Sequence, residues 1–149
     1  MSMREEITEK ILNKKVALGL TWREIASELG KSSPILYTAA LMGQMTLTAE
    51  EATKAATMFG LSEEEARWLT LSPERGSTTT MPPTDPLIYR FYELVQNYGT
   101  TWKALIEEEF GDGIMSAIDF NMSFERKLDP KGDRVKICMS GKFLPFKRF

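Results

Sequence analysis

The hydrophobic positions in the first half of the chain recur at helical spacing, in short segments divided by capping residues and glycines. Residues 4–20 place Ile7, Ile11 and Leu12 close together on a helix, which predicts an amphipathic helix. Four more helices are expected to begin at a Ser or Thr that suits the N-cap position. With their expected ends, they run from Thr21 to Gly30, from Ser33 to Met42–Gly43, from Thr48 to Gly60, and from Ser62 to Trp68–Leu69.

Five short helices joined by tight turns predict a compact bundle, because each helix has an apolar face to bury. We expect this bundle to form a first domain at residues 1–75. A stretch rich in Ser, Thr and Pro follows, in which residues 76–84 are the expected linker, and residues 85–149 form a second domain. The expected core of the bundle is Ile11, Leu12, Ile25, Leu29, Leu36, Leu41, Ala55, Met58 and Leu61.

The second domain is expected to begin with a helix. Asp85 suits the N-cap, and Pro86 suits the first helical position, where the missing N–H costs nothing. We expect this helix to end near Tyr98, with Gly99 as a left-handed C-cap, and a second short helix to cover residues 101–110.

A period of two replaces the helical spacing near Ser116. Large apolar residues alternate with polar ones over residues 118–125, and again over residues 135–139, with turn residues at 129–133 between them. This pattern predicts two strands in a hairpin, which is marginally stable by itself. We therefore expect an α+β fold, with an N-terminal helical bundle followed by C-terminal helices and a β-hairpin that pairs with other subunits.

The residue types that are absent exclude several kinds of chemistry. The 149 residues include no histidine and one cysteine, Cys138. Catalysis by Ser-His-Asp or Cys-His groups, His-ligated metals and an intrachain disulfide are therefore excluded. No apolar run reaches the length of a membrane span, and the first residues lack an apolar signal region. We expect a cytoplasmic protein with no membrane partner, no metal and no cofactor.

The segment from Thr21 to Gly30, followed by a helix, is similar to the helix-turn-helix of repressor-like domains. A DNA-binding protein would use the helix at residues 33–42 to read base edges. That helix contains no Lys, Arg, Asn or Gln, and the formal net charge of the chain is −2. We therefore expect no nucleic-acid partner and interpret the first domain as a helical assembly module.

The second domain carries a long and specific sequence motif. It comprises PTDP at residues 83–86, YRFYE at 89–93, Gln96, Tyr98-Gly99, FGDGIMSAI at 110–118 and GKFLP at 141–145. With these residues the chain resembles cyanase (cyanate hydratase, a lyase), and the resemblance extends over nearly the whole chain. Some relatives carry a cysteine where Ser77 stands here, so thiol chemistry at that position cannot be essential to this chain.

The resemblance implies an activity and a set of site residues. It makes Arg90, Glu93 and Ser116 the counterparts of the catalytic residues of cyanases. The family joins cyanate to bicarbonate, a co-substrate, and gives carbamate and carbon dioxide; carbamate then decomposes to ammonia and more carbon dioxide. No cofactor is implied. The resemblance also implies a homodecamer made of five dimers. Because the hairpin is marginal alone and its apolar face needs another chain, we expect the site to lie between subunits.

Without the resemblance, the same residues have simpler interpretations. Arg90 and Glu93 would be a solvated helix pair, and Ser116 an ordinary residue at the start of a strand. Ser116 is in any case a poor nucleophile, because the chain has no histidine to serve as its base. The neighbouring aromatic residues Tyr89, Phe91 and Tyr92 predict at least partial burial of the ion pair.

Burial would leave Arg90 with spare donors for a planar anion, while Glu93 fixes the guanidinium and Ser116 donates to carboxylate oxygens. A transcriptional regulator and a non-enzymatic oligomeric scaffold are the alternative classes. Bicarbonate-dependent release of ammonia from cyanate distinguishes the enzyme from both.

Overall fold

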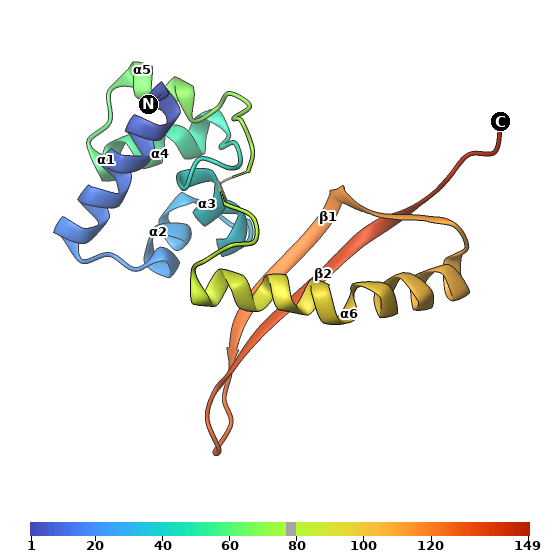
Figure 1. The fold of residues 1–149 in the computed structure, drawn as a ribbon. Helices are drawn as coiled ribbons and strands as arrows, with labels where there is room; N and C mark the ends of the chain where they lie inside the picture. The colour runs from blue at the N-terminus through green and yellow to red at the C-terminus, as the bar shows by residue number, and fades with distance from the viewer. Residues whose placement is uncertain (77–79) are drawn as a thin grey trace. The chain divides into compact units, whose positions relative to one another are not determined.

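The computed structural model describes residues 1–76 and 80–149, and these form six helices and one two-stranded sheet (Figure 1). Helices come first and the β-hairpin last, which confirms the α+β class with an N-terminal helical region. Ser77 and its neighbours up to residue 79, which belong to the expected linker, lie outside the described residues.

The chain divides into two compact units. The first unit contains Met1–Gly76 together with Met122–Ile137, the part of the chain that forms the tip of the hairpin. The second unit runs from the linker to Asn121 and includes Cys138–Phe149. The two strands of the hairpin therefore contribute residues to both units.

The first unit contains the five short helices that the hydrophobic spacing predicts. Thr21, Thr48 and Ser62 each accept a hydrogen bond from the backbone N–H of a glutamate three residues later, whose carboxylate accepts one in return. Ser2 caps the first helix in the same way, a capping box that was not predicted. The helices are α1 (Met3–Leu18), α2 (Trp22–Leu29), α3 (Pro34–Leu41), α4 (Ala49–Phe59) and α5 (Glu63–Trp68).

The core of the bundle contains most of the residues predicted for it. Of these, Ile11, Ile25, Leu29, Leu41 and Ala55 are buried, and Leu36, Met58 and Leu61 pack against them. Leu12 was wrongly assigned to the core: it is only half-buried, because the core-facing residues of α1 are Ile7 and Ile11, one turn apart. The buried residues that the prediction missed include Tyr37, Leu47, Phe59 and Leu69.

Arg4 is a polar cross-link in this bundle. Its Nη2 donates to the carbonyl oxygens of Ala40 and Met45, each at 2.8 Å, and its Nη1 donates to Trp68 O at 3.4 Å. Burial lowers the pKa of Arg4, and its Nε has no hydrogen-bond partner in the described residues. One side chain of α1 therefore satisfies three backbone carbonyls near the ends of other helices.

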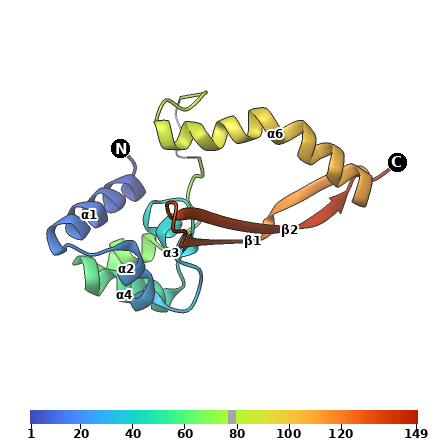
Figure 2. The same cartoon turned by 90° about the horizontal axis from the view of Figure 1, so that it is seen from below.

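The second unit contains a single long helix where two short ones were predicted. α6 (Pro86–Phe110) continues through Gly99 without a break (Figures 1 and 2), so the prediction that Gly99 ends a helix was wrong. Gly99 is not among the glycines with positive φ. A glycine inside a helix costs about 1 kcal/mol relative to alanine, and the hydrogen bonds of the surrounding 25-residue helix outweigh this cost.

None of the residues of α6 is buried in the single chain. The exposed large apolar side chains occur along its whole length: Leu87, Ile88, Phe91, Leu94, Val95, Tyr98, Trp102, Leu105 and Phe110. Monomeric proteins rarely expose so continuous an apolar surface. Even so, no helix in the described part of the chain has the length and hydrophobicity that a membrane span requires.

The hairpin consists of β1 (Gly113–Lys127) and β2 (Arg134–Pro145), which run side by side in both views (Figures 1 and 2). The first strand begins at Gly113, ahead of Ser116, where it was expected to begin. Phe146 N donates to Asp112 O at 3.0 Å, so backbone pairing extends to the open end of the hairpin.

Candidate active site

Arg90 and Glu93 lie one turn apart on α6 and form an ion pair. Asp85 caps the helix by accepting hydrogen bonds from Leu87 N and Ile88 N, which fixes where its first turn begins. Arg90 Nη1 lies 3.6 Å from Glu93 Oε2, a contact that three-residue spacing on a helix allows. The three-residue spacing thus predicted this ion pair correctly.

The ion pair is more accessible than the surrounding aromatic residues led us to expect. The side chains of Arg90 and Glu93 are 65% and 42% exposed in the single chain. Arg90 also lies beside the ring of Tyr89, with 5.8 Å between its guanidinium carbon and the ring centre. In the described residues Glu93 is its one carboxylate partner, so most of its N–H donors point to solvent.

Ser116 is the buried polar residue of the described chain, with 5% of its surface exposed. Its Oγ accepts hydrogen bonds from Ile118 N at 3.0 Å and from Asp119 N at 2.9 Å. These two bonds use the lone pairs of the hydroxyl, and its proton remains available for donation. The geometry therefore suits a hydrogen-bond donor with a fixed oxygen.

Gly141 of β2 allows the backbone at Ser116 to approach closely. A Cβ atom on residue 141 would lie 2.2 Å from Ser116 O and 2.7 Å from Met115 Cγ, so any side chain there would displace the strand. The sequence motif includes Gly141, but its role at Ser116 was not predicted. The available signal was a glycine within a strand, which often marks a place where another backbone segment approaches closely.

The single chain assembles only part of the predicted set. Arg90 and Glu93 contact each other, but no hydrogen bond or ion pair among the described residues joins either one to Ser116. One chain therefore presents an exposed ion pair and a buried hydroxyl as separate features. In residues 1–76 and 80–149, no group of three or more acidic, Cys or His side chains could hold a metal ion.

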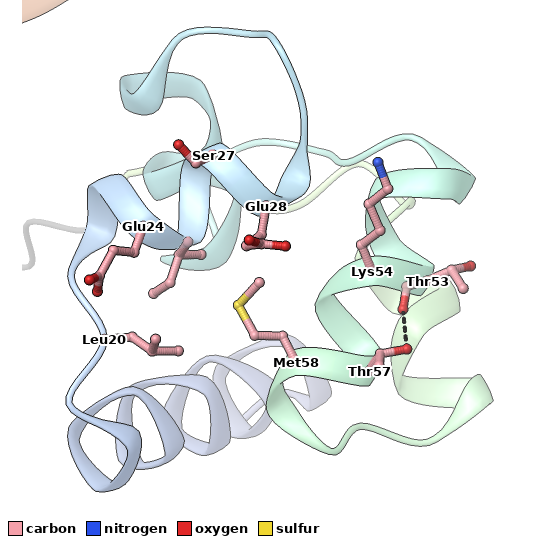
Figure 3. Close-up of a pocket in the computed structure, with 9 residues that line it drawn as sticks. Leu20, Glu24, Ser27, Glu28, Thr53, Lys54, Thr57 and Met58 are labelled. Carbon is pink, nitrogen blue, oxygen red and sulfur yellow. Dashed lines mark hydrogen bonds between the residues drawn. The ribbon is translucent and has the colours of Figure 1, made fainter.

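A groove of about 830 Å³ in the first unit is lined by side chains of other kinds than those of the Arg90, Glu93 and Ser116 set (Figure 3). Met58 lies among the side chains that line it, as do Glu24 and Glu28. Lys54, which like Met58 projects from α4, lies 3.5 Å from Glu50 and is partly neutralised by it. Two carboxylates with one paired cation disfavour a small anion, so this groove is not a candidate anion site.

Comparison with known proteins gives consistent results over both parts of the chain. The family model described as "Cyanate hydratase, N-terminal" matches residues 4–73, and that described as "Cyanate lyase C-terminal domain" matches residues 80–148. Cyanate hydratase from Methylibium petroleiphilum is 59% identical and that from Albidiferax ferrireducens is 56% identical. Each alignment spans 146 residues, covering 98% of this chain and 99% of the relative.

A solved structure has the same fold. The crystal structure of cyanase from T. urticae is 37% identical in sequence, with a TM-score of 0.79. The similarity covers 93% of this chain and 96% of that one, and so includes the helical bundle as well as the region of α6 and the hairpin.

Proposed function

Because the chain belongs to the cyanate lyase (cyanate hydratase) family, we propose that it decomposes cyanate with bicarbonate as co-substrate, giving ammonia and carbon dioxide through carbamate. The observation that carries this proposal is the match of two family models, which together span residues 4–73 and 80–148. The reaction needs no metal or other cofactor, and the donors that it requires exist among the side chains of the chain.

The reaction brings two anions together. A bicarbonate oxygen bonds to the carbon of cyanate, the bicarbonate proton moves to nitrogen, and a dianionic adduct results. After a second proton reaches nitrogen, the C–O bond to the bicarbonate carbon breaks, which releases carbon dioxide and carbamate. Carbamate takes up one more proton and decomposes to ammonia and carbon dioxide. The main barrier is charge repulsion, so catalysis requires preorganised donors and positive potential.

Arg90 supplies the positive charge in this proposal. A guanidinium group presents several N–H donors in one plane, which match the two oxygens of a carboxylate. With one carboxylate contact, at 3.6 Å, Arg90 keeps donors for an anion. Glu93 orients the guanidinium through this contact, as the three-residue spacing allows.

Ser116 donates its hydroxyl proton to an anion oxygen. The two backbone N–H groups that bond to Oγ fix the oxygen and increase the tendency of the hydroxyl to donate outward. This role needs no general base, in agreement with the absence of histidine from the chain.

The active site lies between subunits of a homo-oligomer, in the proposed arrangement a decamer made of five dimers. Two features support self-association. α6 has no buried residue, and the hairpin also exposes apolar side chains, of which Ile118 is 97% exposed and Val135 70% exposed. Covering these faces with a second copy would also remove water from around Arg90 and strengthen its hold on an anion.

We further propose a cytoplasmic location. The single cysteine, Cys138, is an exposed free thiol, which suits a reducing compartment. Imaging of a tagged full-length chain, with fractionation as a second measurement, tests this assignment.

The proposed activity is tested by measuring ammonia release from cyanate, with bicarbonate either added or removed by degassing at acid pH before assay. We expect release that depends on bicarbonate and consumes protons from the medium. Release without bicarbonate would contradict the co-substrate, and no release under any condition would contradict the function. The same assay excludes a regulator or a scaffold if turnover is catalytic.

A further inference from the structure

The tip of the hairpin contacts the bundle at the N-terminal ends of α2 and α3, inside the first unit. Arg23 Nη2 donates to Phe124 O at 3.2 Å, and the guanidinium carbon lies 5.5 Å from the centre of the Phe124 ring. Ser33 Oγ donates to Met122 O at 3.1 Å while it accepts from Ile35 N at 3.2 Å. We call Arg23 and Ser33, with these partners on β1, the hairpin dock.

The two contacts satisfy an exposed strand edge. Met122 and Phe124 are two residues apart on β1, so their carbonyl groups point to the same side of the strand. The sheet has only two strands, and each strand therefore has one edge without a partner strand. Arg23 and Ser33 supply the donors that a third strand would have supplied on that side.

Arg23 is unfavourable in its local setting. It lies in the first turn of α2, where the positive end of the helix dipole disfavours a cation. No carboxylate forms an ion pair with it among the described residues. A residue that opposes its local preference without local compensation points to a function beyond the helix. The contacts with Phe124 are that compensation.

The dock occupies the surface that a helix-turn-helix protein uses for DNA. In such proteins the N-terminal residues of the second helix reach base edges. Here Ser33, the N-cap of α3, donates a hydrogen bond to Met122 O of β1 instead. The ring of Phe124 also lines an apolar groove of about 400 Å³ together with Ile35, Ala39 and Met42. This surface is therefore chemically suited to an apolar strand.

We propose that Arg23 and Ser33 are positioning residues for the cyanate reaction, because they hold the strand that carries Ser116. β1 runs without interruption from Gly113 to Lys127, so Ser116 and the docked carbonyl groups belong to one strand. The inference rests on the proposed function, in which Ser116 binds substrate. In this proposal the helix-turn-helix-like pair α2 and α3 binds the tip of the hairpin and so restrains the strand that carries Ser116.

Arg23→Ala separates the dock from the stability of the bundle. Alanine favours the helix and removes a cation from its positive end, so the thermal stability of the bundle is expected to stay equal or rise. Loss of the dock is expected to speed hydrogen exchange at the tip amides about tenfold and to lower kcat/KM for cyanate by a similar factor. Lys14→Ala, at an exposed cation of α1, is the matched control and leaves all three quantities unchanged.

Ser33 provides a second, independent series. Ser33→Gly introduces a residue that is tolerated at the N-cap, but it removes the hydroxyl donor. Ser33→Thr retains a good N-cap residue and the hydroxyl donor. Faster tip exchange and lower activity are expected for the glycine variant, with recovery in the threonine variant. Glycine at an N-cap costs only a few tenths of a kcal/mol, so a role confined to capping α3 predicts nearly unchanged tip exchange and activity in both variants.

A double-mutant cycle tests whether the dock acts through Ser116. Adding Arg23→Ala to Ser116→Ala is expected to cause no further loss of residual activity, because the hydroxyl that the dock positions is gone. Additive losses would overturn the proposal. So would unchanged tip exchange in Arg23→Ala, or faster exchange with activity equal to that of the Lys14→Ala control.

The test also separates this proposal from the function on which it rests. If the wild-type chain releases no ammonia from cyanate, the proposed function fails and the positioning role fails with it. The exchange measurements on the full chain still decide whether the dock holds the tip, since they need no substrate.

Discussion

At the scale of single residues, Arg90 combines a charge with planar donor geometry, and these two properties can be tested separately. Arg90→Lys keeps the charge but loses the planar fork that matches a carboxylate. We expect kcat/KM to fall at least about tenfold in the bicarbonate-dependent ammonia assay, because a bidentate contact is lost. Arg67→Lys, at another exposed arginine with a carboxylate partner on its own helix, is the control. Near-normal turnover by an assembled Arg90→Lys variant would contradict the proposed role.

Ser116 serves both the fold and the proposed chemistry, so its removal has two expected effects. Ser116→Ala leaves the N–H groups of Ile118 and Asp119 without their acceptor, which is expected to cost about 1–3 kcal/mol of stability. Activity is also expected to fall at a temperature where the variant is fully folded. Such a loss cannot come from unfolding and reflects the missing hydroxyl. Ser123→Ala, at an exposed serine of the same strand, is expected to change neither quantity. Full activity in the Ser116→Ala variant would exclude the hydroxyl as a substrate donor.

The ion pair of the candidate site could be predicted from the sequence, but the environment of the candidate residues could not. Arg90 and Glu93 are paired by helical spacing alone, which is a local property. The side chain of Arg90 is 65% exposed, because no other segment of the single chain covers it, and helical spacing carries no information about such cover. Ser116 is buried, and its backbone lies against Gly141, which is close in space through strand pairing and distant in sequence.

At the scale of elements, Gly99 gives a test of the observed long helix. Gly99→Ala is expected to stabilise the chain by about 1 kcal/mol, because alanine is favoured inside a helix. The added Cβ would have Val95 Cγ1 as its neighbour at 3.8 Å, an ordinary contact. Thermal unfolding of the variant measures the effect. A destabilised variant would instead support the helix end that the sequence had suggested at this glycine.

The elements that the sequence predicted well are those whose signals are local. Capping boxes at Thr21, Thr48 and Ser62 fixed three helix starts, since side chain and backbone partners lie within three residues. Gly99 misled because glycine permits a left-handed cap without requiring one. Whether a helix continues past a glycine depends on the hydrogen bonds of the residues on both sides, and not on the glycine itself.

At the scale of the whole molecule, the proposed site requires more than one chain, and subunit mixing tests this. Arg90→Ala and Ser116→Ala subunits are dissociated, mixed and reassembled. If the two residues of one site come from different chains, some mixed sites regain both wild-type groups and activity is expected to return. The unmixed variants, taken through the same treatment, are the controls. No recovery, with mixing verified by mass measurement, would favour a site within one chain.

The bare surface of α6 also affects how a newly made chain reaches its working state. Under the proposed self-association, the apolar side chains of this 25-residue helix, which has no buried residue in the single chain, become buried only when another copy binds. Folding is then a reaction of higher order, and mass action governs it. The melting temperature is expected to rise with total protein concentration, and dilution is expected to inactivate the enzyme with a delay set by dissociation. A cell that translates the message slowly would therefore hold proportionally less active enzyme than the amount of polypeptide suggests.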